Sequence, residues 1–130
     1  MTHSMHLFMQ VVMADIYEQY PYLDCGPAAL SLAVKNGSSD GVHADVTDYL
    51  GALAWIIAFG AFEGANLKVA QLGQVIGLEQ GDALGINARL LAHASTPLTG
   101  HRAVFTCFVE NTLACGAREF WRMMCFTTKI

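Results

Sequence analysis

The stretch DVTDYLGALAWIIAFGAF, residues 45–62, decides the fold that the sequence predicts. It begins like a capping box, because Asp45 stands at the start and a second acid, Asp48, follows three residues later. Apolar residues then recur at helical spacing, at Val46, Tyr49, Leu50, Leu53 and Ile57. The other sides are apolar too, with Trp55, Ile56, Phe59 and Phe62. The sequence therefore predicts a long helix that is apolar all round and has to be enclosed by protein.

Segments on both sides of this stretch alternate in the two-residue period of strands. This pattern covers residues 30–34, 84–90 and 103–109, and residues 113–124 also read as a long strand. Residues 66–78 fit either a helix or a strand and are assigned to a strand. Short connections between consecutive strands favour antiparallel pairing. We therefore expect one domain over residues 1–130, in which a curved sheet wraps the helix and a second copy completes the burial.

Composition excludes several classes of protein. The chain has 130 residues, 54% of them hydrophobic and 14% charged, which excludes a disordered protein. A net charge of −4 argues against duplex nucleic acid as the main partner. The longest apolar run, residues 50–62, is too short for a membrane helix, and the start of the chain has no basic region typical of a signal peptide. We expect a cytoplasmic protein without a membrane partner.

Metal binding is not expected from the spacing of the candidate ligands. The four cysteines, at positions 25, 107, 115 and 125, fit neither a metal motif nor a dense disulfide framework. His93 and His101 are not spaced as ligands with an identifiable acid.

The order of these segments resembles the hotdog fold, an α+β fold in which a curved antiparallel sheet wraps one long central helix. The resemblance rests on GVHA at residues 41–44, GDAL at 81–84, NARLL at 87–91 and LACG at 113–116. It covers roughly residues 26–124. It implies action on acyl thioesters of coenzyme A or acyl carrier protein by a homodimer or homotetramer. No cofactor is implied beyond the coenzyme A or phosphopantetheine of the substrate.

The resemblance also implies roles for residues at the helix entry. His43 and Asp48 would supply acid–base chemistry, and the backbone N–H groups near Asp45 and Val46 would polarise the thioester carbonyl. Asn36 would hold the attacking water. Hydrolysis is the first expectation, and dehydration of a hydroxyacyl thioester is the alternative, because Asp48 lies one turn into the predicted helix. On base rates, helix capping is the more common role for a residue such as Asp48, and forming a turn is the more common role for one such as Asn36.

A second resemblance is local and chemically different. DCGPAAL at residues 24–30 looks like the nucleophile site of papain-like cysteine peptidases that process bacteriocin leader peptides. That resemblance implies a nucleophile at Cys25, an oxyanion-hole residue at Gln19 and a base at His101. A third alternative is a module that binds acyl chains without turning them over. These alternatives stay open at the level of sequence.

Overall fold

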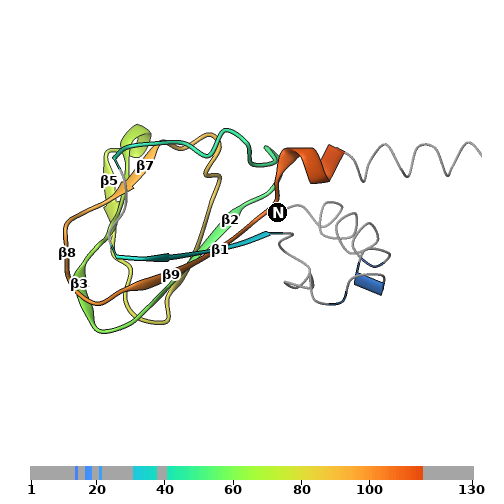
Figure 1. The fold of residues 1–130 in the computed structure, drawn as a ribbon. Helices are drawn as coiled ribbons and strands as arrows, with labels where there is room; N and C mark the ends of the chain where they lie inside the picture. The colour runs from blue at the N-terminus through green and yellow to red at the C-terminus, as the bar shows by residue number, and fades with distance from the viewer. Residues whose placement is uncertain (1–13, 15–16, 19–20, 22–30, 38–40, 116–130) are drawn as a thin grey trace, which may run out of the picture.

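The computed structural model describes residues 14, 17–18, 21, 31–37 and 41–115, and antiparallel strands are the main secondary structure of this described part (Figure 1). Within it, no helix has the length and apolar character needed to cross a bilayer. A 3₁₀ turn, η2, spans Ala70–Leu72, and residues 111–115 are helical. The strands are β1 (Ser31–Asn36), β2 (Ala54–Phe59), β3 (Phe62–Gly64), β4 (Leu67–Val69), β5 (Gln74–Ile76), β6 (Ala83–Ile86), β7 (His93–Ser95), β8 (Leu98–Gly100) and β9 (Ala103–Phe108).

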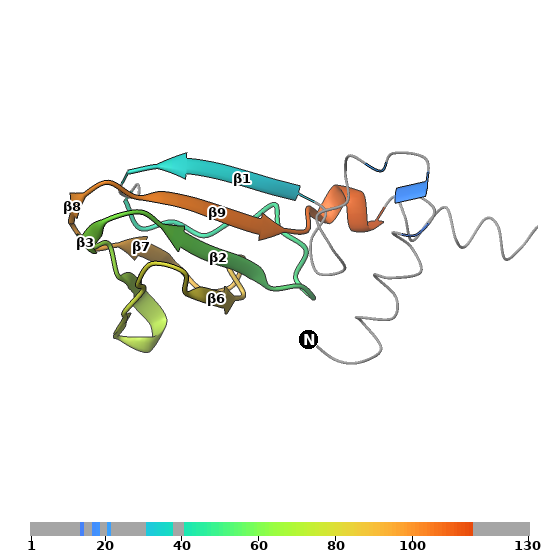
Figure 2. The same ribbon diagram turned by 90° about the horizontal axis from the view of Figure 1, so that it is seen from below.

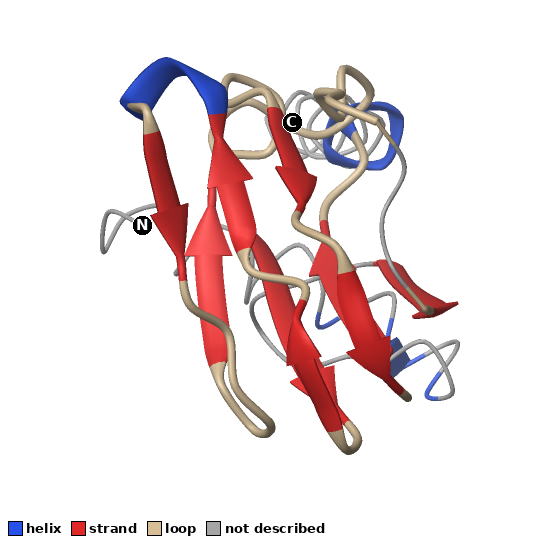
Figure 3. Cartoon of the chain, turned by 90° about the vertical axis from the view of Figure 1, so that its left-hand side faces the viewer, coloured by secondary structure: helices blue, strands red, loops and turns tan. Residues whose placement is uncertain are grey.

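Three pairs of strands are nested one inside another along the chain. β2 pairs with β9, β3 with β8 and β4 with β7, all antiparallel. Figure 2 shows the larger sheet, in the order β1-β9-β2-β6, with its four strands side by side. A smaller sheet has the order β5-β4-β7, and Figure 3 looks onto the end where β3 and β8 lie. β3 and β8 form a separate two-stranded sheet, and the nested pairing resembles that of a jelly roll, in which one long hairpin is folded over.

The core lies between the two sheets and follows from strand alternation. On β2, Ala54, Ile56 and Ala58 are buried, whereas Trp55 and Ile57 on the opposite face are half-buried. The buried side chains pack against those of the smaller sheet and of the intervening segments, in a cluster of Ala54, Ile56, Leu67, Val69, Leu78, Ile86, Ala88 and Val104. Burial of one face of each sheet is the main stabilising contribution to such a fold.

The predicted central helix is wrong, and with it the hotdog fold. Residues 46–53 form turns and irregular backbone, 54–59 form β2, and 62–64 form β3. In an apolar run of this length, periodicity alone does not distinguish a helix from a strand that has apolar side chains on both faces. The density of aromatic and β-branched residues at 55–59 favours the strand. Gly60 then ends β2 with φ of 120°, where a Cβ would collide with the carbonyl oxygen of His101.

The remaining secondary-structure predictions have mixed outcomes. The strands predicted over 30–34 and 103–109 correspond to β1 and β9, except that residue 30 lies outside the described residues and β9 ends at Phe108; residues 66–78 contain β4 and β5. The strand predicted over 84–90 ends at Ile86 and gives way to a turn. Residues 113–115 are helical, so the strand predicted there is wrong, and 116–124 lie outside the described residues. Pairing of consecutive strands holds for β4 with β5 but not for the nested pairs.

Candidate metal centre

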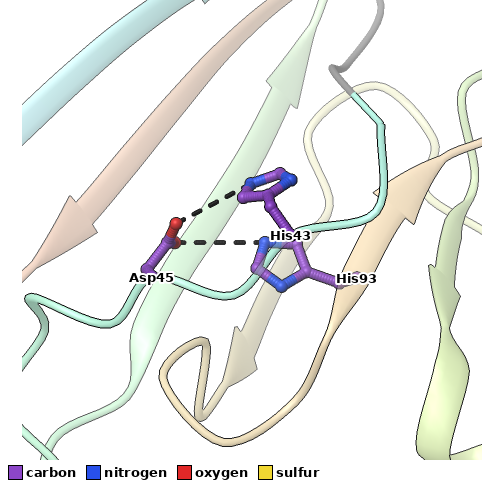
Figure 4. Close-up of side chains that lie close together, drawn as sticks. All are labelled: His43, Asp45 and His93. Carbon is purple, nitrogen blue, oxygen red and sulfur yellow. Dashed lines mark ion pairs between the residues drawn. The ribbon is translucent and has the colours of Figure 1, made fainter.

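Three side chains that can bind a metal ion gather at one end of the smaller sheet: His43, Asp45 and His93 (Figure 4). One ligand atom of each lies within 4.8 Å of the others. The Asp45 carboxylate lies beside the two rings and faces both (Figure 4), with Oδ1 at 3.7 Å from Nε2 of His43 and Oδ2 at 3.9 Å from Nε2 of His93. All three side chains therefore direct a donor atom toward one point.

Strand pairing explains why residues so distant in sequence meet here. His43 and His93 form an antiparallel bridge, in which each backbone N–H donates to the other residue's carbonyl, at 3.0 and 2.8 Å. Directly opposed residues share a face, and their rings lie 4.5 Å apart. Asp45 follows His43 by two residues on an extended segment, so its side chain points the same way. The backbone N–H of Asp45 is fixed by the carbonyl of Ala88 at 2.9 Å.

Both imidazoles are held in the same tautomer by nearby backbone carbonyls. Nδ1 of His43 lies 2.9 Å from the carbonyl oxygen of Gly41, and Nδ1 of His93 lies 2.8 Å from that of Leu91. A carbonyl only accepts, so each neutral ring donates from Nδ1 and keeps its lone pair on Nε2. The Nε2 atoms are those that face Asp45. Hydrogen bonding of the other ring nitrogen to a carbonyl is the usual arrangement for a histidine that binds a metal.

A cavity of about 160 Å³ adjoins the three side chains and extends between the sheets. His93 is 6% exposed, whereas His43 and Asp45 are partly open to solvent, so the cluster can be reached from outside. The cavity walls are mostly apolar, from β2, β4 and β9, and include Ala54, Ile56, Leu67 and Val104. Lys35 and Arg102 are its cationic lining residues.

Arg102 is a buried cation whose hydrogen bonds are incomplete. It is 6% exposed, and its Nε has no hydrogen-bond partner among the described residues. Its Nη1 donates to Oγ of Ser95 at 3.5 Å, and the guanidinium lies over the ring of Phe62. Burial lowers the pKa of Arg102 from its ordinary value, because the charged form is poorly solvated. A buried guanidinium with incomplete hydrogen bonds is costly, and a bound anion would reduce that cost.

The three donors fit a catalytic divalent metal ion. Two imidazole nitrogens and one carboxylate are ligands of zinc and of non-haem iron. Ligand atoms bound to one ion lie roughly 3–3.5 Å apart at bond lengths of about 2.1 Å, so closure from the observed separations needs only small side-chain movements. Three protein ligands on a partly exposed site leave coordination positions for substrate.

Two of the site residues predicted from the sequence lie in this cluster, as candidate metal ligands rather than as parts of a thioester site. His43 and Asp45 are brought together, and His93 joins them, which spacing along the chain could not show. Val46 is exposed beside Asp45, and Asn36 at the end of β1 lines a second cleft with Phe59 and His101. The sequence does contain a signal for this metal site: His43 and Asp45 lie two residues apart. The predictions above did not use it.

The other sequence interpretations stay predictions. Gln19 and Cys25 lie outside the described residues, and His101 is exposed in the connection between β8 and β9, so the peptidase arrangement is not tested. Action on acyl thioesters and assembly into a homodimer are also untested, although the fold that suggested them is wrong.

Asp48, the predicted catalytic carboxylate, lies outside the lining of the cavity. It is 8% exposed; its N–H donates to the Asp45 carbonyl at 2.9 Å, and its own carbonyl accepts from Nη1 of Arg89 at 2.8 Å. Burial, together with the charges of Asp45 and Glu110, raises the pKa of Asp48 from 3.8 to about 6, against the lowering effect of Arg89. Through these backbone hydrogen bonds, Asp48 connects the segment that carries His43 and Asp45 to the rest of the fold.

Asp48→Asn should stabilise the metal-free protein at neutral pH. The folded chain holds the Asp48 proton more tightly than the unfolded chain, so this group's contribution to stability is present below pH 4 and is lost as pH rises through about 6. We expect the free energy of unfolding to rise by about 1–2 kcal/mol at pH 7.5 and to change little at pH 4. Urea denaturation in EDTA measures both values. Glu63→Gln, at an exposed carboxylate on β3, is the control, and an equal gain at both pH values would contradict the expectation.

Comparison with models of protein families and with curated proteins gives no match for this chain. The chemistry of the site therefore has to be inferred from the geometry of the three ligands and from the cavity beside them.

Proposed function

We propose that this protein is a non-haem Fe(II) oxygenase that uses a 2-oxo acid as co-substrate. His43, Asp45 and His93 would hold the metal ion, and Arg102 would bind the second carboxylate of the co-substrate. The observation that supports this most is the convergence of two Nε2 atoms and one carboxylate beside a cavity that contains a buried, incompletely bonded guanidinium. Two histidines and one carboxylate with open positions are typical of non-haem iron oxygenases.

Other uses of the same donors fit less well. Structural zinc sites are closed by four protein ligands, whereas the described residues contribute three to this cluster, which is partly exposed. A hydrolytic zinc enzyme is the second candidate, because it too has three protein ligands and an open position. Arg102 favours the oxygenase, since it offers the same cavity a planar donor for a carboxylate.

The chemistry of a 2-oxo acid matches this pairing of a metal site with an arginine. An Fe(II) ion held by His43, Asp45 and His93 would supply the redox chemistry by which O₂ reacts with the 2-oxo acid. Hydroxylation of a C–H bond by O₂ needs two electrons in addition to those of that bond, and oxidative decarboxylation of the 2-oxo acid supplies them. One oxygen atom enters the shortened carboxylic acid, the other enters the substrate as a hydroxyl group, and CO₂ leaves.

The protein's own residues would orient this co-substrate. Asp45 contributes a single negative charge, so a site loaded with a divalent ion stays positive and attracts the 2-oxo carboxylate. Arg102, on the cavity wall, would fix the far carboxylate and thereby the orientation of the molecule. The apolar walls from β2, β4 and β9 limit the access of water to the reacting atoms.

The test is co-substrate turnover by the purified chain. The protein is loaded with Fe(II) under anaerobic conditions and given 2-oxoglutarate, ascorbate and O₂, and succinate is measured. Ascorbate supplies the two electrons when no primary substrate is present. We expect succinate to form only when iron and O₂ are both present, and pyruvate, which lacks the second carboxylate, to react far more slowly.

Two outcomes would overturn the proposal. One is failure of the chain to bind Fe(II) at all. The other is activity with Zn(II) on esters or amides, without decarboxylation, which would favour the hydrolytic candidate.

A further inference from the structure

We infer that Gln71 is a positioning residue of the metal centre, acting through a single peptide plane on the ring of His93. The inference rests on the proposed metal site and extends it beyond the three ligands. Gln71 lies in η2, the 3₁₀ turn that follows β4, and its side chain reaches across to the segment that leads into β7.

The side-chain amide of Gln71 bonds to two consecutive peptide groups of that segment. Its Oε1 accepts from the backbone N–H of Ala92 at 2.9 Å, and its Nε2 donates to the carbonyl of Leu90 at 2.9 Å. The backbone of the same turn adds a third bond, from the N–H of Ala70 to the carbonyl of Ala92 at 2.9 Å. η2 is therefore tied to the residues immediately before His93.

The peptide group held by Oε1 is the one that orients His93. The N–H of Ala92 and the carbonyl of Leu91 belong to the same planar unit and point in opposite directions. That carbonyl lies 2.8 Å from Nδ1 of His93. A bond to one side of the plane fixes the direction of the other and makes the Leu91 oxygen a better acceptor. Gln71 thus favours the tautomer with its proton on Nδ1, and so the lone pair on Nε2 that faces Asp45.

Packing does not account for this arrangement. η2 has no buried residue, and Gln71 is exposed. β7 is already held in register by its ladder with β4, in which His93 pairs with Val69, Ala94 with Lys68 and Ser95 with Leu67. The contribution of Gln71 is therefore not the register of β7 but the orientation of the peptide group beside His93, the metal ligand.

The experiment compares metal affinity in three variants, using Co(II) as the probe because its absorption reports its coordination. We expect Gln71→Ala to weaken Co(II) binding roughly tenfold, at the lower end of the 10–100-fold range for residues outside the ligand set. Gln71→Glu keeps the acceptor for Ala92 and should stay within about threefold of the native protein. Gln74→Ala is the matched control, because Gln74 is an exposed glutamine on β5 and not part of this network.

A second measurement separates positioning from a loss of stability. In metal-free protein, ¹⁵N NMR of the imidazoles should show His93 protonated on Nδ1 in the native chain and a mixture of tautomers in Gln71→Ala. Unchanged tautomers together with a Co(II) affinity equal to that of Gln74→Ala would overturn the inference. If the native chain binds no Co(II), the proposed function fails, and the tautomer measurement still decides the role of Gln71.

Discussion

Replacing His93 by alanine is expected to abolish tight metal binding. His93 is the buried ligand of the three, on β7, and its Nε2 faces the Asp45 carboxylate at 3.9 Å. Changes outside the ligand set already cost 10–100-fold in affinity, so loss of a ligand should cost at least ~100-fold, or about 2.7 kcal/mol. Isothermal titration with Fe(II) or Co(II) under anaerobic conditions measures the loss. Succinate formation should fall to the level of iron without protein.

Asp45→Asn gives an independent check on the same centre. The amide keeps the shape of the side chain but removes the negative charge that faces the two imidazoles. We expect a loss of affinity comparable to that of His93→Ala, with little change in the melting temperature of the metal-free protein. His101→Ala is the control, because His101 is exposed and does not belong to the cluster. Native affinity in His93→Ala would show that these residues do not form a metal site.

The second large effect is expected at Arg102, which should determine binding of the 2-oxo acid. Arg102→Met replaces the guanidinium by an apolar side chain that still fills part of the buried space. Losing one partner of a buried charge pair costs roughly 2–5 kcal/mol, so 2-oxoglutarate should bind about 30- to 5,000-fold more weakly. Metal affinity should stay within about twofold of the native value, since Arg102 is not one of the ligands. Titration of the anaerobic Fe(II) protein with 2-oxoglutarate measures the first value.

Two controls show whether the carboxylate contact is the cause. Arg102→Lys keeps the charge but loses the planar pair of donors, so its affinity should fall between those of the native protein and Arg102→Met. Pyruvate has no second carboxylate, and its weak turnover should be unaffected by Arg102→Met. Equal losses with pyruvate and 2-oxoglutarate would mean that the substitution damages the cavity as a whole.

The sequence was most informative where apolar and polar residues alternate. The two-residue period located β1 and β9, because successive side chains of a strand point to opposite faces of the sheet. It failed over residues 46–62, where residues 54–59 are apolar on both faces and helical and extended periods both fit. From that single ambiguity came the central helix, the curved sheet around it and the hotdog resemblance.

Only part of the site could be predicted from the sequence, and the physical reason differs from one site residue to the next. His43 and Asp45 are two residues apart, so the sequence could place them together, although the prediction gave them roles in the chemistry of an acyl thioester. His93 comes fifty residues after His43, and no local pattern relates the two. Gln71 and Arg102 are likewise separated from the ligands along the chain, so their roles depend on contacts made only after folding.

By itself, the amino-acid sequence determined which faces of the strands are apolar, the overall acidity of the chain and the two-residue spacing of the first two ligands. These properties follow from neighbouring residues and from composition. Only the tertiary structure decided that β7 lies beside the segment of His43 and that β9 begins next to a buried guanidinium. Nested strand pairing brings together residues that are distant in the chain. Backbone hydrogen bonds do not select one pairing over another, because every strand edge offers the same N–H and carbonyl groups. Side-chain packing in the assembled core selects among those pairings, and the metal centre is a consequence of that selection.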